Sequence, residues 1–506
     1  MLAQPPSPVP QKTWLARLLR FPAYAVLFFA GLQCLVWTLA PALTHHAPPL
    51  DVIESYLWGH EWVVGTFKHP NMPGWVLEVS RELTGSIGWP AYLASQVFVA
   101  TTLLFIFLLG REMMDSRRAL AGTLLLFGVF YISWPSIEFN HNVAQMPFWA
   151  GIVWMLWRLR SRPEVLWWAL LGFLAADSLY AKLSSGLLLF IGGLWILSDA
   201  PLRRQLATIG PWLGLTVFGL LIVPLLIWLF GSHFSPLLYA AERSAQSSEG
   251  PLRFLGAQAI ACIGLAGLAA VAGLIGPFGA KRGEDPGPPT EVPRVVIAFL
   301  ATFLLAPILL TVVVATLAGA GLKSMWGAPM LGLSGLLTVA LTSARLTEGV
   351  LQRLAAGVLV LLIVLPLGYG LDTLFEGRLT GKPKRQNWPQ AAIAARFSEL
   401  WQQRTGKPLR IVGGERWIAG LVALKPGPMP SIMTDGNFTM SPWISGHRIL
   451  QQGLLLVWEM QLPTDGPPAA FAWFLAGRPA SVERFDWPLF PGAPPLLIGY
   501  AIVPPA

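Results

Sequence analysis

Long apolar stretches, separated by short polar segments, occupy roughly the first three quarters of the chain. Eleven of them are long enough, or nearly so, to cross a bilayer as helices, and they lie at about 21–43, 89–110, 119–135, 143–157, 164–180, 183–198, 206–230, 254–278, 295–318, 326–342 and 349–371. The pattern predicts an α-helical polytopic membrane protein with about eleven transmembrane helices. The two shortest segments are neighbours, so losing both would leave the orientation of the other helices unchanged.

The pattern changes after residue 371, because residues 372–506 contain no segment long enough to span. The stretch WPQAAIAARFSELWQQR has apolar residues at helical spacing, while LRIVGG and GLLLVW are typical of short buried strands. We expect a transmembrane domain over 1–371 and a small α/β domain over 372–506. Gly413 and Gly414 follow a predicted strand, but a dinucleotide fingerprint needs a third, spaced glycine that is missing here.

Composition supports a membrane protein. The chain is 54% hydrophobic and only 12% charged, whereas soluble domains carry about 25% charged residues. The 23 tryptophans suit a membrane–water interface. Cys34 and Cys262 each lie in an apolar run and indicate neither a disulfide framework nor a metal site. The first eleven residues are polar and proline-rich, and we expect no cleavable signal peptide.

Positive charge fixes the expected orientation. If the N-terminus is cytoplasmic, most lysines and arginines of the short loops fall on the cytoplasmic side, and the opposite side holds only Lys68, Arg81, Lys182, Arg243, Arg253 and Lys323. This bias accounts for the net charge of +9 without a nucleic-acid partner. The same orientation places all seven histidines and the C-terminal domain outside. The segment 279–293 is predicted to be a flexible cytoplasmic linker.

The first outer loop, residues 44–88, is long for a connection between membrane helices. Within its DVIESYLWGHEW segment, apolar residues such as Ile53, Leu57 and Trp62 recur at helical spacing. The spacing predicts an amphipathic juxtamembrane helix lying along the outer membrane surface.

Asp51 precedes this helix, three residues ahead of Glu54. That spacing favours a capping box, in which Asp51 bonds free amides of the first turn and Glu54 reaches back. It also permits Asp51 to act as a general base at the edge of the membrane. The two roles are compatible, because a cap also fixes its side chain.

The segment TFKHPNMPGW places Lys68 and His69 between rigidifying prolines. Taken alone, Lys68 is interpreted equally well as an interfacial lysine that contacts lipid phosphates as it is as a substrate-binding residue. Other outer segments add His141 in EFNHN, Lys182 beside Asp177, and Lys323 before a helix. Asp177, if within a span, needs a partner, and Lys182 is the expected one. Three or more cations on one face favour recognition of an anionic, lipid-linked substrate.

These residues resemble a family signature. Bacterial membrane glycosyltransferases of the GT-C fold, related to protein mannosyltransferases, lipid A aminoarabinose transferases and lipid A core galacturonosyltransferases, carry D-x-x-E…W…G-Y-x-K-H-P-P-L…W, which is matched here by Asp51, Glu54, Trp58, Gly65, Lys68-His69-Pro70 and Trp75. Weaker resemblances continue through residues 139–149, 180–189, 323–333 and 430–443. Two positions depart from the signature: Phe67 replaces the tyrosine, and Asn71 replaces the second proline, which we expect to loosen the turn.

The resemblance implies a hexosyl- or pentosyltransferase of a bacterial inner membrane, with its active site on the periplasmic side. The donor would be a sugar on a polyprenyl phosphate, and the acceptor a hydroxyl of lipid A, another cell-envelope glycan or a protein. Asp51 would accept the hydroxyl proton as the anomeric carbon is attacked with inversion. Lys68, His69, His141, Lys182 or Lys323 would contact the donor phosphate or the acceptor. Glu54 would orient Lys68 or His69, or bind a divalent cation together with His69.

Two alternatives come from other classes. A secondary transporter usually places charged residues near the bilayer midplane, whereas here they gather in loops. Another polyprenyl-linked enzyme, such as an O-antigen ligase, usually relies on arginine and histidine in a later outer loop. Residues 231–250 contain His233 and Arg243 and are instead compatible with a flexible loop that covers the donor.

Overall fold

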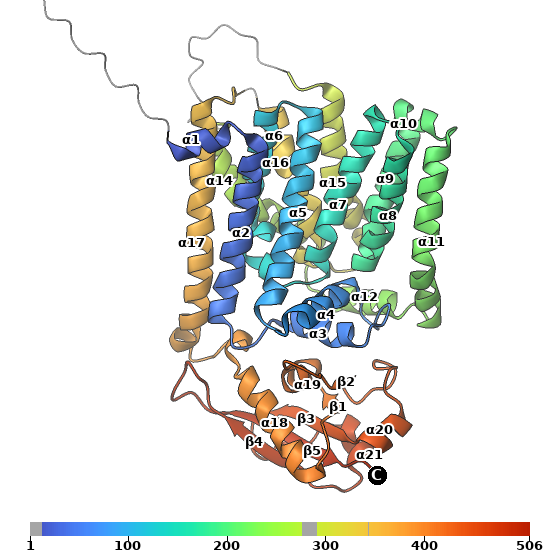
Figure 1. Ribbon diagram of the computed structural model, residues 1–506, viewed down its shortest axis with the longest axis vertical. Coiled ribbons are helices and arrows are strands. Elements are labelled where there is room, and N and C mark those ends of the chain that lie inside the picture. Colours follow the sequence, from blue (N-terminus) through green and yellow to red (C-terminus); the bar gives the residue numbers. More distant parts are fainter. Residues whose placement is uncertain (1–12, 276–290, 343) are drawn as a thin grey trace, which may run out of the picture.

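The computed structural model describes residues 13–275, 291–342 and 344–506. It consists of a bundle of long helices and a C-terminal α/β domain that sits below one end of the bundle (Figure 1). Two short helices of the first loop, α3 and α4, lie across that end, between the bundle and the C-terminal domain (Figure 1). The predicted linker at 279–293 falls almost entirely outside the described residues.

Most helices of the bundle follow the predicted apolar segments, but the chain bends by 83° within the predicted span at 119–135, between 116–128 and 130–137. In chain order the α-helices up to the C-terminal domain are α1 (Trp14–Leu19), α2 (Pro22–Thr44), α3 (Leu50–His60), α4 (Met72–Thr84), α5 (Trp89–Met113), α6 (Ser116–Leu125), α7 (His141–Ser161), α8 (Val165–Ala181), α9 (Gly186–Ser198), α10 (Ala200–Gln205), α11 (Ile209–Gly231), α12 (Ser235–Ala245), α13 (Pro251–Ala261), α14 (Ile263–Ala272), α15 (Arg294–Leu317), α16 (Ser334–Leu341) and α17 (Glu348–Thr380). Short 3-10 segments complete them: η1 (Leu126–Gly128), η2 (Phe130–Ile132), η3 (Trp134–Ile137), η4 (Leu183–Ser185) and η5 (Ser324–Leu333).

Among the described residues, seven helical segments are long and apolar enough to cross a membrane, and an eighth crossing results if the bent pair of 116–128 and 130–137 counts as one span. The predicted spans at 164–180 and 183–198 form shorter apolar helices. A multi-pass helical bundle is therefore confirmed, and the number eleven stays a prediction. Cys34 and Cys262 are free thiols, as expected.

The first-loop helix α3 is covered by other parts of the chain. Its residues from Val52 to Gly59 are all buried, because α4 packs on one side and the C-terminal helix α19 (Arg416–Ala423) on another. Glycines allow the closest approach: a Cβ on Gly59 would lie 2.1 Å from the carbonyl oxygen of Gly74 in α4. The apolar residues of α3 therefore pack against protein, and its position along the outer membrane surface stays a prediction.

The C-terminal domain is a five-stranded sheet with helices, which confirms the predicted α/β class. Strand order is β2-β1-β3-β5-β4. Strand β1 pairs in parallel with β2 and β3, and β5 pairs antiparallel with β3 and β4. The strands are β1 (Ile411–Gly414), β2 (Ser431–Thr434), β3 (Leu454–Met460), β4 (Ser481–Phe485) and β5 (Leu496–Val503), and the remaining elements are η6 (Arg385–Asn387), α18 (Gln390–Thr405), α20 (Gly446–Gln452), η7 (Ala469–Phe471) and α21 (Ala472–Leu475).

The domain docks directly on the first loop. Helix α19 begins two residues after β1 ends and contacts α3, and a Cβ on Gly420 would come within 2.3 Å of the Ile53 side chain. Helix α17 continues to Thr380, past the predicted end of the last span, before the chain enters the domain. The N-terminal end of α19 is thereby held against α3.

Candidate active site

The turn that carries Lys68 is built by hydrogen bonds of its neighbours. The hydroxyl of Thr66 accepts the amides of Lys68 and His69 at 3.3 and 3.4 Å, and the Thr66 amide donates to the His69 carbonyl at 2.9 Å. Gly65 and Pro70 form an isolated antiparallel bridge. The segment is therefore a closed turn, which fixes the direction of the Lys68 and His69 side chains.

Asn71 tightens this turn, contrary to the expectation that it loosens it. Its side-chain amide donates to the carbonyls of Trp58 and Val63, at 2.9 and 3.0 Å, and its backbone amide donates to Val64. Asn71 is 1% exposed. A proline at this position would have no amide to donate, so the asparagine ties the turn to the end of α3 in a way that the family's proline cannot.

Lys68 lies between the two carboxylates of the D-x-x-E motif. Its Nζ is 3.2 Å from Oδ1 of Asp51 and 2.6 Å from Oε2 of Glu54. Asp51 is not the predicted cap: α3 is capped at Pro49 with no side-chain cap bond, and Asp51 lies in the first turn. The capping-box prediction was wrong because both carboxylates turn toward Lys68 instead of toward the helix amides.

Glu54 also binds a cation from the C-terminal domain. Nη1 of Arg416 lies 2.7 Å from Oε1 of Glu54, whose side chain is only 2% exposed. Burial raises the pKa of Glu54, while Lys68 and Arg416 act against that rise. Burial opposes the charge of Lys68, but Asp51 and Glu54 outweigh it and raise the pKa of Lys68 above its ordinary value. Lys68 is therefore held as a cation.

The carboxyl group of Glu138 binds the backbone of Asp51. Its Oε1 accepts the backbone amide of Asp51 at 3.0 Å. Burial, followed by the charge of Asp51, raises the pKa of Glu138 to about 8, so this carboxyl group is mostly protonated at neutral pH. Asp51 keeps 27% of its side chain exposed, whereas the side chain of Glu54 is 2% exposed, so of the two carboxylates that hold Lys68, Asp51 is the one that an incoming molecule can reach.

Two histidines and a second lysine lie on the other side of Lys68. The rings of His69 and His141 are 4.2 Å apart, and Nε2 of His141 lies 3.0 Å from the carbonyl oxygen of Pro70. Burial, His141, Lys182 and Lys68 together lower the pKa of His69 well below its ordinary value. Its imidazole is therefore neutral at physiological pH.

Lys182 reaches the same region from the end of α8. Its Nζ donates to Oδ1 of Asn142 at 2.6 Å and lies 5.9 Å from the Trp326 ring. Its predicted partner, Asp177, forms no ion pair with it in the described part of the chain. Lys323 precedes η5, and within the described residues no contact joins its ammonium to Asp51, Glu54 or Lys68.

Three neighbours of the site were not assigned to it from the sequence. Glu138 is visible in EFNHN, but nothing in the spacing places it under Asp51. Tyr239 of α12 has its ring 6.0 Å from that of Phe67 and 6.1 Å from that of His69. Arg416 lies in a domain where sequence reasoning identified no site residue, and no local motif marks it.

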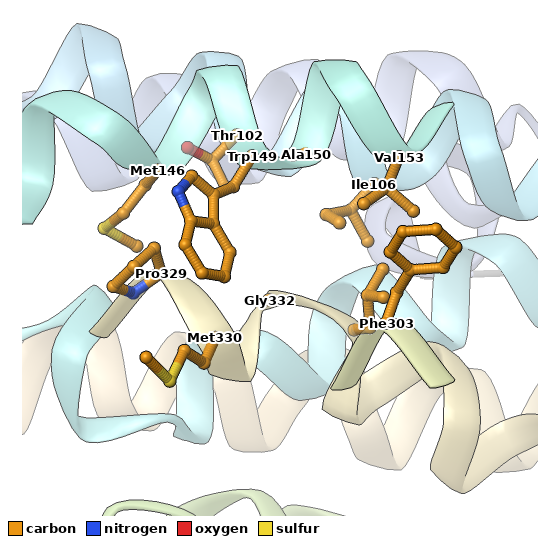
Figure 2. A pocket seen from close by; sticks show the side chains of 11 residues that line it. Thr102, Ile106, Met146, Trp149, Ala150, Val153, Phe303, Pro329, Met330 and Gly332 are labelled. Atoms are coloured by element: carbon orange, nitrogen blue, oxygen red, sulfur yellow. The ribbon is translucent and has the colours of Figure 1, made fainter. Parts of the chain in front are cut away.

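The residues present do not fit the divalent cation considered for Glu54 and His69. Both Glu54 oxygens already bind cationic side chains, and the described residues contain no group of three or more His, Cys, Asp or Glu arranged to hold a metal ion. A hollow between α5, α7, α15 and η5 is lined by apolar side chains such as Trp149, Phe303 and Met330 (Figure 2), and it offers no comparable chemistry.

The comparisons with known proteins agree with the resemblance. Residues 68–228 match the family model for dolichyl-phosphate-mannose-protein mannosyltransferase. The crystal structure of ArnT from Cupriavidus metallidurans bound to undecaprenyl phosphate matches with a TM-score of 0.59 at 13% identity, covering 94% of this chain and 97% of that one. ArnT in the apo state matches with a TM-score of 0.58 at 14% identity, with the same coverage. No curated protein matches.

At such low identity the ArnT match establishes a shared fold, and the family match covers the segment that begins at Lys68 and contains His141 and Lys182. Together they confirm the resemblance to the membrane glycosyltransferases of the GT-C fold that the first-loop motif indicated.

Proposed function

We propose that the chain transfers a sugar from a polyprenyl-phosphate donor to a hydroxyl group of an acceptor outside the cytoplasm, with inversion at the anomeric carbon. The observation that carries this proposal is the position of Asp51. Its partly exposed carboxylate lies in hydrogen-bonding contact with Lys68, next to the His69–His141 pair and Lys182. A carboxylate, two lysines and two histidines thus lie together at one end of the bundle, and they could serve as a base and as contacts to a phosphate.

Asp51 is assigned the role of general base. Glu54 cannot readily take it, because two cations hold its buried oxygens. Glu138 is half-buried and, with its raised pKa, mostly protonated at neutral pH. An acceptor hydroxyl at Asp51 would give its proton to the carboxylate while its oxygen attacks the anomeric carbon. The bond from that carbon to the phosphate oxygen breaks in the same displacement.

The leaving lipid phosphate needs compensation for the charge that develops on it. Lys68 and Lys182 would supply positive charge, and His69 and His141 would supply ring N–H donors. A phosphate among these groups would also favour protonation of His69, so the histidine can bind it either as a neutral donor or as a cation. Undecaprenyl phosphate, present in the ArnT structure, is the first carrier to test.

The distribution of lysine and arginine over the loops supports a site on the outer side of the membrane. The resemblance of the first-loop motif to bacterial enzymes supports an inner membrane, whose outer side is the periplasm. The acceptor then meets Asp51 from the periplasm, where lipid A, other cell-envelope glycans and protein hydroxyls are all available. The transferred sugar is a hexose or a pentose, and the donor that supports transfer identifies it.

The test is a transfer reaction with purified full-length protein in detergent. A panel of polyprenyl-phosphate sugars is supplied with a total lipid extract as acceptor, and released polyprenyl phosphate is measured. Release that depends on one donor supports the proposal and identifies the sugar. If no donor leads to release of polyprenyl phosphate and reconstituted vesicles show solute counterflow, the proposed transferase function is overturned in favour of a transporter.

A further inference from the structure

Glu54 is bound by two cations that come from different parts of the chain. Lys68 of the first loop contacts Oε2 at 2.6 Å, and Arg416 of the C-terminal domain contacts Oε1 at 2.7 Å. Each carboxylate oxygen therefore has its own cation, although the residues that supply them are separated by most of the chain length.

This arrangement matters because Lys68 has two competing tasks. In the structure its ammonium is held by Asp51 and Glu54, yet a donor phosphate would need the same ammonium. If Lys68 turned toward a phosphate and Glu54 had no second cation, an ionised carboxylate would remain buried without a partner, which is strongly unfavourable. Without Arg416, Glu54 would compete with the donor for Lys68.

We propose that Arg416 is a positioning residue that neutralises Glu54 and so releases Lys68 to the donor phosphate. This inference rests on the proposed function. It makes the C-terminal domain part of the active site, because its docking on α3 brings a second cation to Glu54.

The local structure suits Arg416 to this task. It is the first residue of α19, which follows β1 directly and is capped by the side chain of Glu415. Close packing of Gly420 on Ile53 holds the helix on α3. The guanidinium also lies 5.8 Å from the ring of Phe67, the residue before Lys68. Arginine keeps its charge at any physiological pH, so the neutralisation does not depend on a proton.

The test measures binding of undecaprenyl phosphate to the purified full-length protein, which requires no sugar transfer. We expect Arg416→Met to weaken binding at least tenfold, because Glu54 then retains Lys68. The double variant Glu54→Gln with Arg416→Met should bind within threefold of the wild type, since a neutral glutamine no longer holds the lysine. Arg416→Lys keeps the charge and should also bind within threefold. Arg404→Met, at an exposed position of α18, is the matched control.

The rescue separates a positioning role from a structural one. If Arg416 only fastened the domain to α3, removing Glu54 as well would not restore binding. The inference is therefore overturned if Arg416→Met binds like the wild type, or if the double variant binds as weakly as the single one. Failure of the wild type to bind at all would instead overturn the proposed function, and this inference with it.

Discussion

The backbone amide of Asp51 donates a hydrogen bond to the carboxyl group of Glu138, 3.0 Å away. This bond joins the first turn of α3 to the segment between η3 and α7, and it satisfies an amide that has no partner within the helix. The bond also holds the carboxyl group of Glu138 close to that of Asp51. The protonation of Glu138 and the position of Asp51 are therefore linked.

This link predicts how stability depends on pH. The pKa of Glu138 is raised from 4.5 to about 8 in the folded protein, so folding favours its protonated form. Its contribution to stability is complete below pH 4.5 and is lost as the pH rises through 8. We expect the melting temperature in detergent to fall between pH 6 and pH 9, and to fall less in Glu138→Gln. An equal fall in both proteins would contradict the assignment.

Removing the side chain of Asn71 should open the Lys68 turn. Asn71→Ala loses two hydrogen bonds and leaves the Trp58 and Val63 carbonyls without this donor, at a cost of about 1–3 kcal/mol. We expect a lower melting temperature together with weaker transfer, measured against Gln403→Ala at an exposed position of α18. Unchanged stability and activity would show that the turn does not need this anchor.

The sequence predicted the class of the fold, and it singled out Asp51, Glu54 and Lys68, which the structure brings into contact, because both rest on local patterns. Apolar length identified the helices, short apolar runs identified β1 and β3, and the seventeen-residue separation of Asp51 and Lys68 lies within one loop. The cap at Asp51 was wrong, and the covering of α3 by α19 was not predicted, because side-chain partners and covering elements come from distant parts of the chain. Arg416 is 362 residues from Glu54, and no spacing rule connects them.

The crossing of α3 and α4 should not tolerate a side chain at Gly59. A methyl group there would lie 2.1 Å from the Gly74 carbonyl oxygen, so Gly59→Ala must push the helices apart, at a cost of about 1–3 kcal/mol. We expect a lower melting temperature and a loss of transfer activity. Gly88→Ala is the matched control, because nothing lies within 4 Å of its added methyl group. Equal behaviour of the two variants would refute the close packing.

Lys182 should contribute to binding of the donor phosphate. Lys182→Met removes a buried cation from the region of His69, and we expect about tenfold weaker binding of undecaprenyl phosphate, consistent with the strength of charge-assisted hydrogen bonds. Lys323→Met is the informative comparison, because Lys323 makes no described contact with the same cluster and should cause a smaller loss. A larger loss at Lys323 would place the phosphate nearer η5.

The central claim is that Asp51 removes the acceptor proton, and the most direct measurement is the rate of polyprenyl-phosphate release by Asp51→Asn with the donor that the wild type uses. Asparagine keeps the size of the side chain but is not a base, so we expect the rate to fall at least 100-fold. The melting temperature and undecaprenyl phosphate binding should stay close to those of the wild type, and Glu82→Gln, in the same loop, should remain active. Transfer by Asp51→Asn at the wild-type rate would contradict the account.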